Sequence, residues 1–172
     1  MSLDVAKGAA AMFVAAIVQV TLLAAIDVFH GAPDVVLVTL VAVALLRGTI
    51  FGAAAGFGAG LVVDTATLQT LGVSSLLLTL AGYWIGRYGE TTGRDRTHAP
   101  FVSVAVVTIL YSVGALILHY MLGDPASAKR VLVDALPFQL LFNLVLTLPV
   151  YALCRRLFRP PATGLEEVRL LG

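Results

Sequence analysis

The sequence is poor in charged residues, and this scarcity indicates which class of protein it is. Of its 172 residues, 12% are charged and 59% are hydrophobic, whereas a soluble domain carries about 25% charged residues. So few charges cannot cover a water-facing surface, which excludes an ordinary soluble protein. Several apolar runs approach or exceed the roughly 20 residues that a membrane-spanning helix needs. The composition therefore predicts a polytopic membrane protein that lies mainly in lipid.

Residues that carry chemistry are also scarce. The single cysteine, Cys154, cannot form an internal disulfide, and we interpret it as a small buried hydrophobe. The three histidines lie far apart in different segments, so no metal-ligand spacing exists and we expect no metal or cofactor. Neither a nucleophile–base pair nor a phosphate-binding loop occurs, which argues against an enzyme. A net charge of +1 gives no signal for nucleic acid, and we expect no nucleic-acid partner.

The apolar runs predict an all-α fold of six transmembrane helices. The predicted spans are residues 8–29, 33–46, 48–63, 71–87, 101–122 and 131–158. The second and third are short, so three arrangements stay open for them: little tilt, a partly interfacial position, or a tight hairpin buried among the other helices. We assign residues 1–158 to one transmembrane domain and residues 159–172 to a flexible cytoplasmic tail that contains Pro and Gly.

The positions of Lys and Arg predict the orientation of these spans. With a cytoplasmic N-terminus, nine basic residues fall on the cytoplasmic side: Lys7, Arg47, Arg87, Arg94, Arg96, Arg155, Arg156, Arg159 and Arg169. The outer side then holds two basic residues, Lys129 and Arg130, and most of its charge is acidic. We therefore predict that both termini are cytoplasmic. No predicted span carries a charge near its middle, which argues against a proton pump or an ion-coupled transporter.

The third span contains a strip of glycines at helical spacing. Gly48, Gly52, Gly56 and Gly60 recur every four residues, and such strips let a second helix approach closely in lipid. Two alternatives stay open for this strip. It packs against another helix of the same bundle, or it forms a seam for a partner helix.

Polar residues form stripes along three of the predicted spans. Gln139, Asn143 and Thr147 share one face of the sixth span. Thr108, Ser112 and His119 share a face of the fifth, and Ser75, Thr79 and Tyr83 share a face of the fourth. Because polar groups that face lipid would lack partners, these faces are expected to turn inward. They would either form interhelical hydrogen bonds or line a polar cavity for a small ligand.

Asp64 interrupts the apolar sequence between the third and fourth spans. We place it in an outer turn, at the water interface, where Ser74, Ser75 or a preceding Thr would cap the fourth helix. Two roles stay open for the carboxylate. It organises the turn through local side-chain-to-backbone hydrogen bonds, or it contacts a basic group of a partner just outside the membrane.

The central part of the sequence resembles the rod shape-determining protein MreD family. The resemblance covers about 55 residues, "PDVVLVTLVAVALLRGTIFGAAAGFGAGLVVDTATLQTLGVSSLLLTLAGYWIGR". It consists of a Pro-Asp that opens an apolar run, an Arg-Gly before a Gly-rich helix, Gly-Leu-x-x-Asp at its end, a Leu-Gly turn, and closing Gly-Tyr and Gly-Arg pairs. In this sequence the matching residues are Pro33, Asp34, Arg47, Gly48, Gly56, Gly60, Leu61, Asp64, Leu71, Gly72, Gly82, Tyr83, Gly86 and Arg87.

The resemblance implies a non-enzymatic membrane component of the bacterial elongation (rod) complex. Such a protein lies in the bacterial cytoplasmic membrane and scaffolds or regulates lateral peptidoglycan synthesis, and hence cell shape. Its implied direct partner is an MreC-like bitopic membrane protein. MreB filaments, RodA and a class B penicillin-binding transpeptidase are implied as indirect partners.

A transporter subunit is the alternative reading. The family also resembles the six-helix substrate-binding subunit of energy-coupling-factor vitamin transporters, and the inward polar stripes would then line a pocket. Ala-xxx-Ala pairs in the first span, Ala6 with Ala10 and Ala11 with Ala15, are of the kind by which such subunits dock their coupling protein, although Ala-rich helices contain such pairs by chance.

Overall fold

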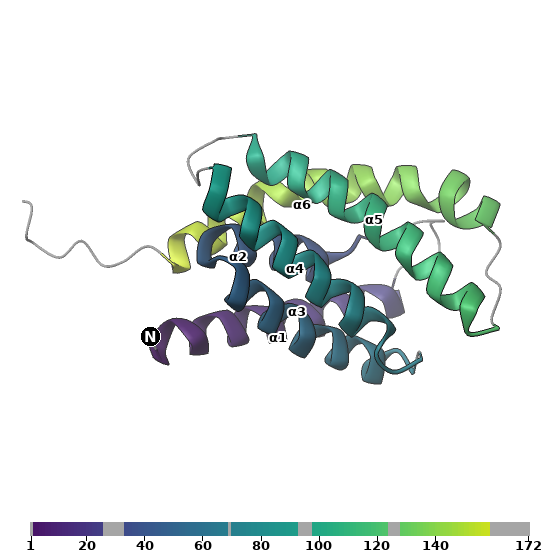
Figure 1. Ribbon diagram of the computed structural model, residues 1–172, viewed down its shortest axis with the longest axis horizontal. Helices are drawn as coiled ribbons and strands as arrows, with labels where there is room; N and C mark the ends of the chain where they lie inside the picture. The colour runs from purple at the N-terminus through teal and green to yellow at the C-terminus, as the bar shows by residue number, and fades with distance from the viewer. Residues whose placement is uncertain (1, 26–32, 69, 93–97, 124–127, 159–172) are drawn as a thin grey trace, which may run out of the picture.

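The apolar runs form helices that lie side by side in one bundle (Figure 1). The computed structural model describes residues 2–25, 33–68, 70–92, 98–123 and 128–158, and this part of the chain is helical with short turns. The helices are α1 Ser2–Ala25, α2 Val35–Arg47, α3 Thr49–Ala66, α4 Val73–Thr92, α5 Ala99–Met121, a π-helical segment η1 Arg130–Ala135, and α6 Leu136–Leu157. The six α-helices correspond to the six predicted spans, with ends shifted by up to six residues.

Three helical segments of the described residues are long and apolar enough to cross a membrane. These are Thr49–Ala66, Ala99–Met121 and the continuous stretch Arg130–Leu157. Two shorter apolar segments, Ala6–Thr21 and Val35–Arg47, accompany them. The structure therefore supports a membrane protein made of helices, with α3, α5 and α6 as its clearest spans.

Helix α2 lies at the centre of the bundle. Its residues Val35 to Leu45 are all buried, and it contacts α1, α3, α4, α5 and α6. A helix that is covered on every side needs apolar residues all round, which explains why every buried residue of this segment except Thr39 is apolar. Its 13 residues span about 20 Å, which is less than the roughly 30 Å of a bilayer core. The surrounding helices shield α2 from lipid, so a short helix suffices there.

The two short predicted spans, α2 and α3, have different surroundings in the structure. Helix α2 is enclosed, whereas α3 exposes one face that includes Ile50 and Phe57. Gly48 alone joins the two helices, with a φ of +91° that glycine adopts without steric cost. Its N–H donates to the carbonyl of Ala44 at 2.8 Å. The chain can therefore leave α2 and start α3 within one residue.

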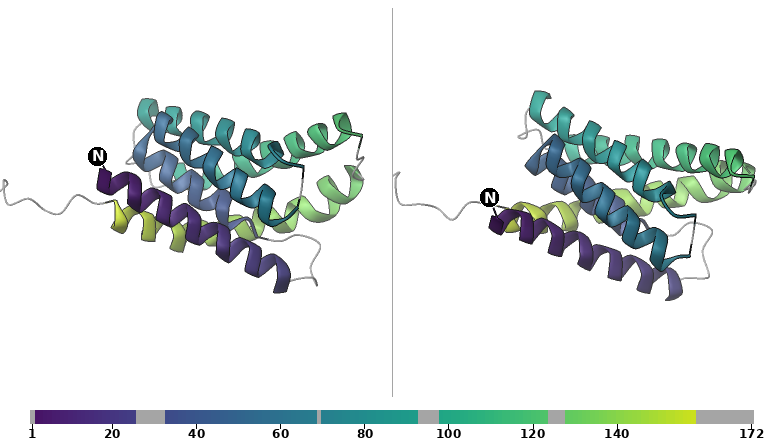
Figure 2. Two further views of the ribbon diagram at one scale, coloured as in Figure 1. Left: turned by 90° about the horizontal axis from the view of Figure 1, so that it is seen from below. Right: turned by 60° about the horizontal axis from the view of Figure 1, so that its bottom comes forward.

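Helices α5 and α6 also pack against α2 and run beside each other (Figures 1 and 2). The segment η1 precedes Pro137, which lies in the first turn of α6 and has no N–H to donate. At this junction the N–H of Leu136 bonds to the carbonyl of Val131. The wider π-type turn thus leads into α6 at the proline.

Candidate functional site

The start of α2 is a buried polar centre. Asp34 caps the helix, and its Oδ1 accepts a hydrogen bond from the N–H of Leu37 at 2.9 Å. Gln19 of α1 accepts from the N–H of Val35 at 2.6 Å. Asn143 of α6 accepts from the N–H of Asp34 itself at 2.8 Å. The first N–H groups of a helix have no partner within the helix, so side chains from three helices together satisfy a start that lies inside the bundle.

The polar stripe of α6 faces α5 and the start of α2. Asn143 is fully buried, and its Nδ2 donates to the hydroxyl of Thr108 at 3.0 Å. Ser112 of α5 donates to Gln139 at 3.3 Å, and the hydroxyl of Thr147 donates to the carbonyl of Asn143 at 2.7 Å. These contacts favour the interhelical alternative for the stripe. Gln19 belongs to the same buried polar centre. The sequence does not predict this role, because a single polar residue in an Ala-rich helix forms no recognisable pattern.

Asp64 caps α4 across the turn that follows α3. Its side chain is 1% exposed, so the expected contact of the carboxylate with water is wrong, whereas its place in an outer turn stays a prediction. The carboxylate accepts hydrogen bonds from the N–H groups of Gly72 at 2.8 Å, Ser74 at 3.2 Å and Ser75 at 3.4 Å. The expected hydroxyl cap of α4 is replaced by this carboxylate. The geometry favours the local role of Asp64, and a contact with a partner stays a prediction.

The hydroxyls around Asp64 bind other groups. Ser75 donates to the carbonyl of Phe57 at 3.1 Å, which joins α4 to α3. Tyr111 of α5 donates to the hydroxyl of Ser74 at 3.2 Å. Thr65 and Thr67 donate to carbonyls of their own helix. The turn is thus held by Asp64, while the two serines connect α4 to its neighbouring helices.

Glu90 caps α3 from the opposite end of α4. Its carboxylate accepts from the N–H of Thr49 at 2.8 Å and from the hydroxyl of Thr49 at 2.7 Å. Sequence reasoning missed this contact, because the two residues are 41 positions apart and no local motif connects them. Asp64 of α3 caps α4 and Glu90 of α4 caps α3, so the two helices are fastened to each other at both ends.

The glycine strip of α3 packs against α4. A Cβ atom added to Gly56 would lie 2.6 Å from the carbonyl carbon of Leu78, and one added to Gly60 would lie 2.5 Å from the nitrogen of Ser75. A Cβ on Gly52 would lie 2.5 Å from the carbonyl oxygen of Gly82. Such distances leave no room for a side chain, so the two backbones touch. This placement favours the alternative in which the strip packs inside the bundle.

Gly48 differs from the other glycines of the strip. It lies in the joint between α2 and α3, and an added Cβ would clash with the carboxylate of Glu90. Gly58, on the exposed side of α3, has no atom within 4 Å of an added Cβ. The strip that contacts α4 therefore consists of Gly52, Gly56 and Gly60, and Gly48 serves the turn.

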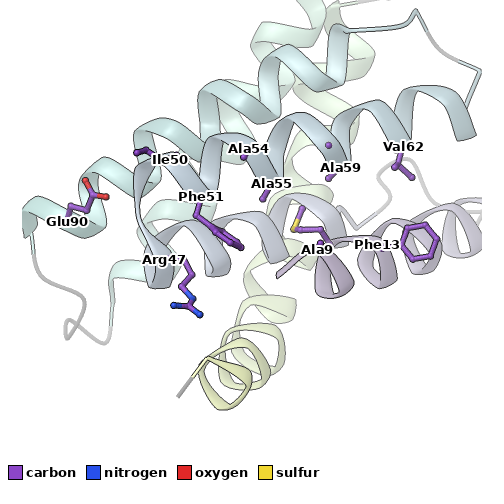
Figure 3. A pocket seen from close by; sticks show the side chains of 12 residues that line it. Ala9, Phe13, Arg47, Ile50, Phe51, Ala54, Ala55, Ala59, Val62 and Glu90 are labelled. Carbon is purple, nitrogen blue, oxygen red and sulfur yellow. The ribbon is translucent and has the colours of Figure 1, made fainter. Parts of the chain in front are cut away.

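A groove with a volume of about 790 Å³ runs between α1 and α3 (Figure 3). Its walls are apolar and its floor holds small residues of α3, among them Ala54, Ala55 and Gly58. Arg47 and Glu90 lie at one end of it. The guanidinium carbon of Arg47 lies 4.9 Å from the centre of the Phe158 ring, so this end also adjoins the end of α6.

The chemistry of these groups is structural. Within the described ranges, no cluster of three or more His, Cys, Asp or Glu side chains is placed to hold a metal ion. The carboxylates of Asp34, Asp64 and Glu90 each bind N–H groups at a helix start. The polar groups therefore hold helices in register, and among the described residues the groove between α1 and α3 offers space for a ligand.

The comparisons with known proteins identify the family. Residues 8–157 match the family model described as rod shape-determining protein MreD. Neither the curated proteins nor the solved structures gave a match. The family match covers most of the chain and includes all the caps described above. The chain therefore belongs to the rod shape-determining protein MreD family.

Proposed function

We propose that this protein is a non-enzymatic scaffold or regulator in the bacterial elongation complex, which directs lateral peptidoglycan synthesis. Membership of the MreD family makes it a rod shape-determining membrane component. The observation that carries the finer proposal is the use of its polar groups. Asp34, Asp64 and Glu90 all cap helices, which supports a rigid membrane platform for other proteins.

The proposed direct partner is an MreC-like bitopic membrane protein. Through it the complex would include MreB filaments, RodA and a class B penicillin-binding transpeptidase. The location that we propose is the bacterial cytoplasmic membrane, with all six helices spanning or filling it and both termini in the cytoplasm. The distribution of Lys and Arg supports this orientation. The tail, residues 159–172, lies outside the described residues, and its flexible cytoplasmic nature stays a prediction.

A vitamin-binding transporter subunit is the weaker alternative. It needs the polar stripes to line a pocket, whereas Asn143 binds Thr108 and the backbone of Asp34. Ser112 and Gln139 bind each other. These groups are occupied within the chain, which favours the scaffold. The predicted likeness to the transporter fold gains no support, since no solved structure matches.

Complementation tests the scaffold proposal. The chromosomal copy is depleted in its rod-shaped host, and a tagged copy of the protein is expressed in its place. We expect the tagged copy to restore rod shape and to co-purify an MreC-like protein. Rounded cells despite normal abundance of the tagged copy, or purification without any such partner, would contradict the proposal. Import of a labelled vitamin that depends on the tagged copy would favour the transporter subunit.

A further inference from the structure

The groove between α1 and α3 has two chemically different parts. Its long wall is apolar and is formed by Met12 and Phe13 of α1 and by Phe51 and Val62 of α3, among others. Its end carries charge, with Arg47 and Glu90 in the lining. Figure 3 shows Arg47 at the end of the groove, away from Phe13 and Val62. An apolar channel with a charged end has the polarity of a lipid, with tails along the wall and a headgroup at the end.

Basic residues from three helices gather at this charged end. Lys7 of α1 donates from its Nζ to the carbonyl of Leu157, at the end of α6, at 3.4 Å. Arg47 of α2 lies over Phe158, the next residue. Arg155 and Arg156 occupy the last turn of α6 and are exposed. Lys7 and Arg47 thus meet at the end of α6, whose last turn carries two further cationic residues.

Among the described residues that line the groove, the one acid, Glu90, caps a helix. Glu90 accepts from the N–H and the hydroxyl of Thr49, at the start of α3. A helix N-terminus carries partial positive charge, which offsets part of the charge of this carboxylate. The balance of charges at the end of the groove therefore favours the binding of an anion.

We propose that the α1–α3 groove binds an anionic phospholipid, with its acyl chains along α3 and its phosphate beside Arg47 and Lys7. Basic pockets between transmembrane helices recognise such headgroups. The observations that carry the proposal are the volume and apolar wall of the groove and the convergence of cations at one end. Glu90 is the one helix cap that also lines the groove, and the proposal goes beyond the scaffold function without depending on any protein partner.

Lipid retention by the purified protein tests the site. The protein is exchanged into detergent with equal amounts of phosphatidylglycerol and phosphatidylcholine that carry the same acyl chains, and retained lipid is counted by native mass spectrometry. We expect retention of phosphatidylglycerol to exceed that of phosphatidylcholine. Arg47→Gln should reduce this preference about fivefold, and Arg47→Lys should largely keep it. Arg87→Gln is the matched control, since Arg87 is an exposed basic residue of α4 outside the groove lining.

A second variant tests the apolar part of the groove. Gly58→Phe points a ring into open space, so it should fill the groove while the protein keeps its thermal stability. We expect retention of both lipids to fall. Val106→Phe, on an exposed face of α5, is the control and should retain both lipids as the wild type does.

Three results would overturn the proposal. Equal retention of the two lipids by the wild type would contradict a site that recognises the anionic headgroup. Equal effects of Arg47→Gln and Arg87→Gln would mean that general surface charge attracts the lipid. A dimer that Gly58→Phe dissociates without loss of lipid would assign the groove to a second copy of this chain. None of these results depends on cell shape or on MreC, so a failure here is distinct from a failure of the scaffold function.

Discussion

At the scale of single residues, three carboxylates do the same physical task. Asp34, Asp64 and Glu90 each accept hydrogen bonds from N–H groups at the start of a helix. In lipid, a backbone N–H without a partner costs several kcal/mol, and the helix dipole adds a preference for negative charge at this end. An acidic residue is therefore the natural cap for helix starts that lie among other helices.

Asp64 gives the sharpest test of this capping. Asp64→Ala leaves buried N–H groups without an acceptor and should lower the free energy of unfolding by about 1–3 kcal/mol. Asp64→Asn keeps one acceptor oxygen and should cost less. Denaturant unfolding of the purified protein measures both. Thr65→Val is the control, because the hydroxyl of Thr65 binds only carbonyls of its own helix.

The same variants separate the two roles that remain for Asp64. If the residue acts only as a cap, Asp64→Asn accumulates and supports rod shape. If its charge contacts a partner, this variant is abundant, yet the cells round up and less MreC-like protein co-purifies. An Asp64→Ala protein as stable as the wild type would show that the three hydrogen bonds contribute little.

Asn143 allows a test by a double-mutant cycle. Its Nδ2 donates to the hydroxyl of Thr108, so Asn143→Ala and Thr108→Val should couple by about 0.6 kcal/mol, the average for such bonds between membrane helices. Thr147 binds the backbone carbonyl of Asn143, so Thr147→Val should be additive with Asn143→Ala. Unfolding free energies of the single and double variants decide this. Additive unfolding free energies in both pairs would contradict a stabilising hydrogen bond between α5 and α6.

At the scale of helices, α3 and α4 form the closest pair of the fold. Their backbones touch at Gly56 and Gly60, and reciprocal caps fasten both ends. In lipid, where burial of apolar surface between helices gives little gain, close packing is what drives helix association. This pair therefore depends on the absence of side chains at a few positions of α3.

Two glycines of one helix make a controlled comparison. Gly56→Ala puts a methyl group against the backbone of Leu78, and overpacking of this kind costs about 1–3 kcal/mol. Gly58→Ala meets open space and should stabilise α3 by up to about 1 kcal/mol through helix propensity. Thermal unfolding in detergent should move the two variants in opposite directions. Equal shifts would mean that propensity alone determines the outcome.

The sequence predicts the elements of this fold well because each leaves a local pattern. The apolar runs place all six helices, and the four-residue glycine spacing marks the packed face of α3. Hydrogen bonds between residues that are far apart in the sequence leave no such local pattern. Asn143 is 109 positions from Asp34, and Glu90 is 41 from Thr49. The sequence marks Asp64 as an interruption of the apolar run, but its burial depends on how the turn folds back over it.

At the scale of the whole molecule, the inner and outer ends of the bundle should differ in accessibility. Leu68 is 93% exposed at the predicted outer turn, and Thr91 is exposed at the predicted inner end of α4. In a Cys154→Ala background, Leu68→Cys should react with a membrane-impermeant thiol reagent in intact cells. Thr91→Cys should react only after the cells are opened. The reverse pattern would invert the proposed orientation.

The burial of α2 has a consequence for the order of assembly. The ribosome releases this helix second, yet the amide that accepts the N–H of Asp34 belongs to Asn143 on the last helix. Until α6 arrives, the start of α2 has an open position that only water or a temporary partner fills. A nascent chain that stops before Asn143 therefore leaves the N–H of Asp34 without the acceptor that it has in the complete bundle.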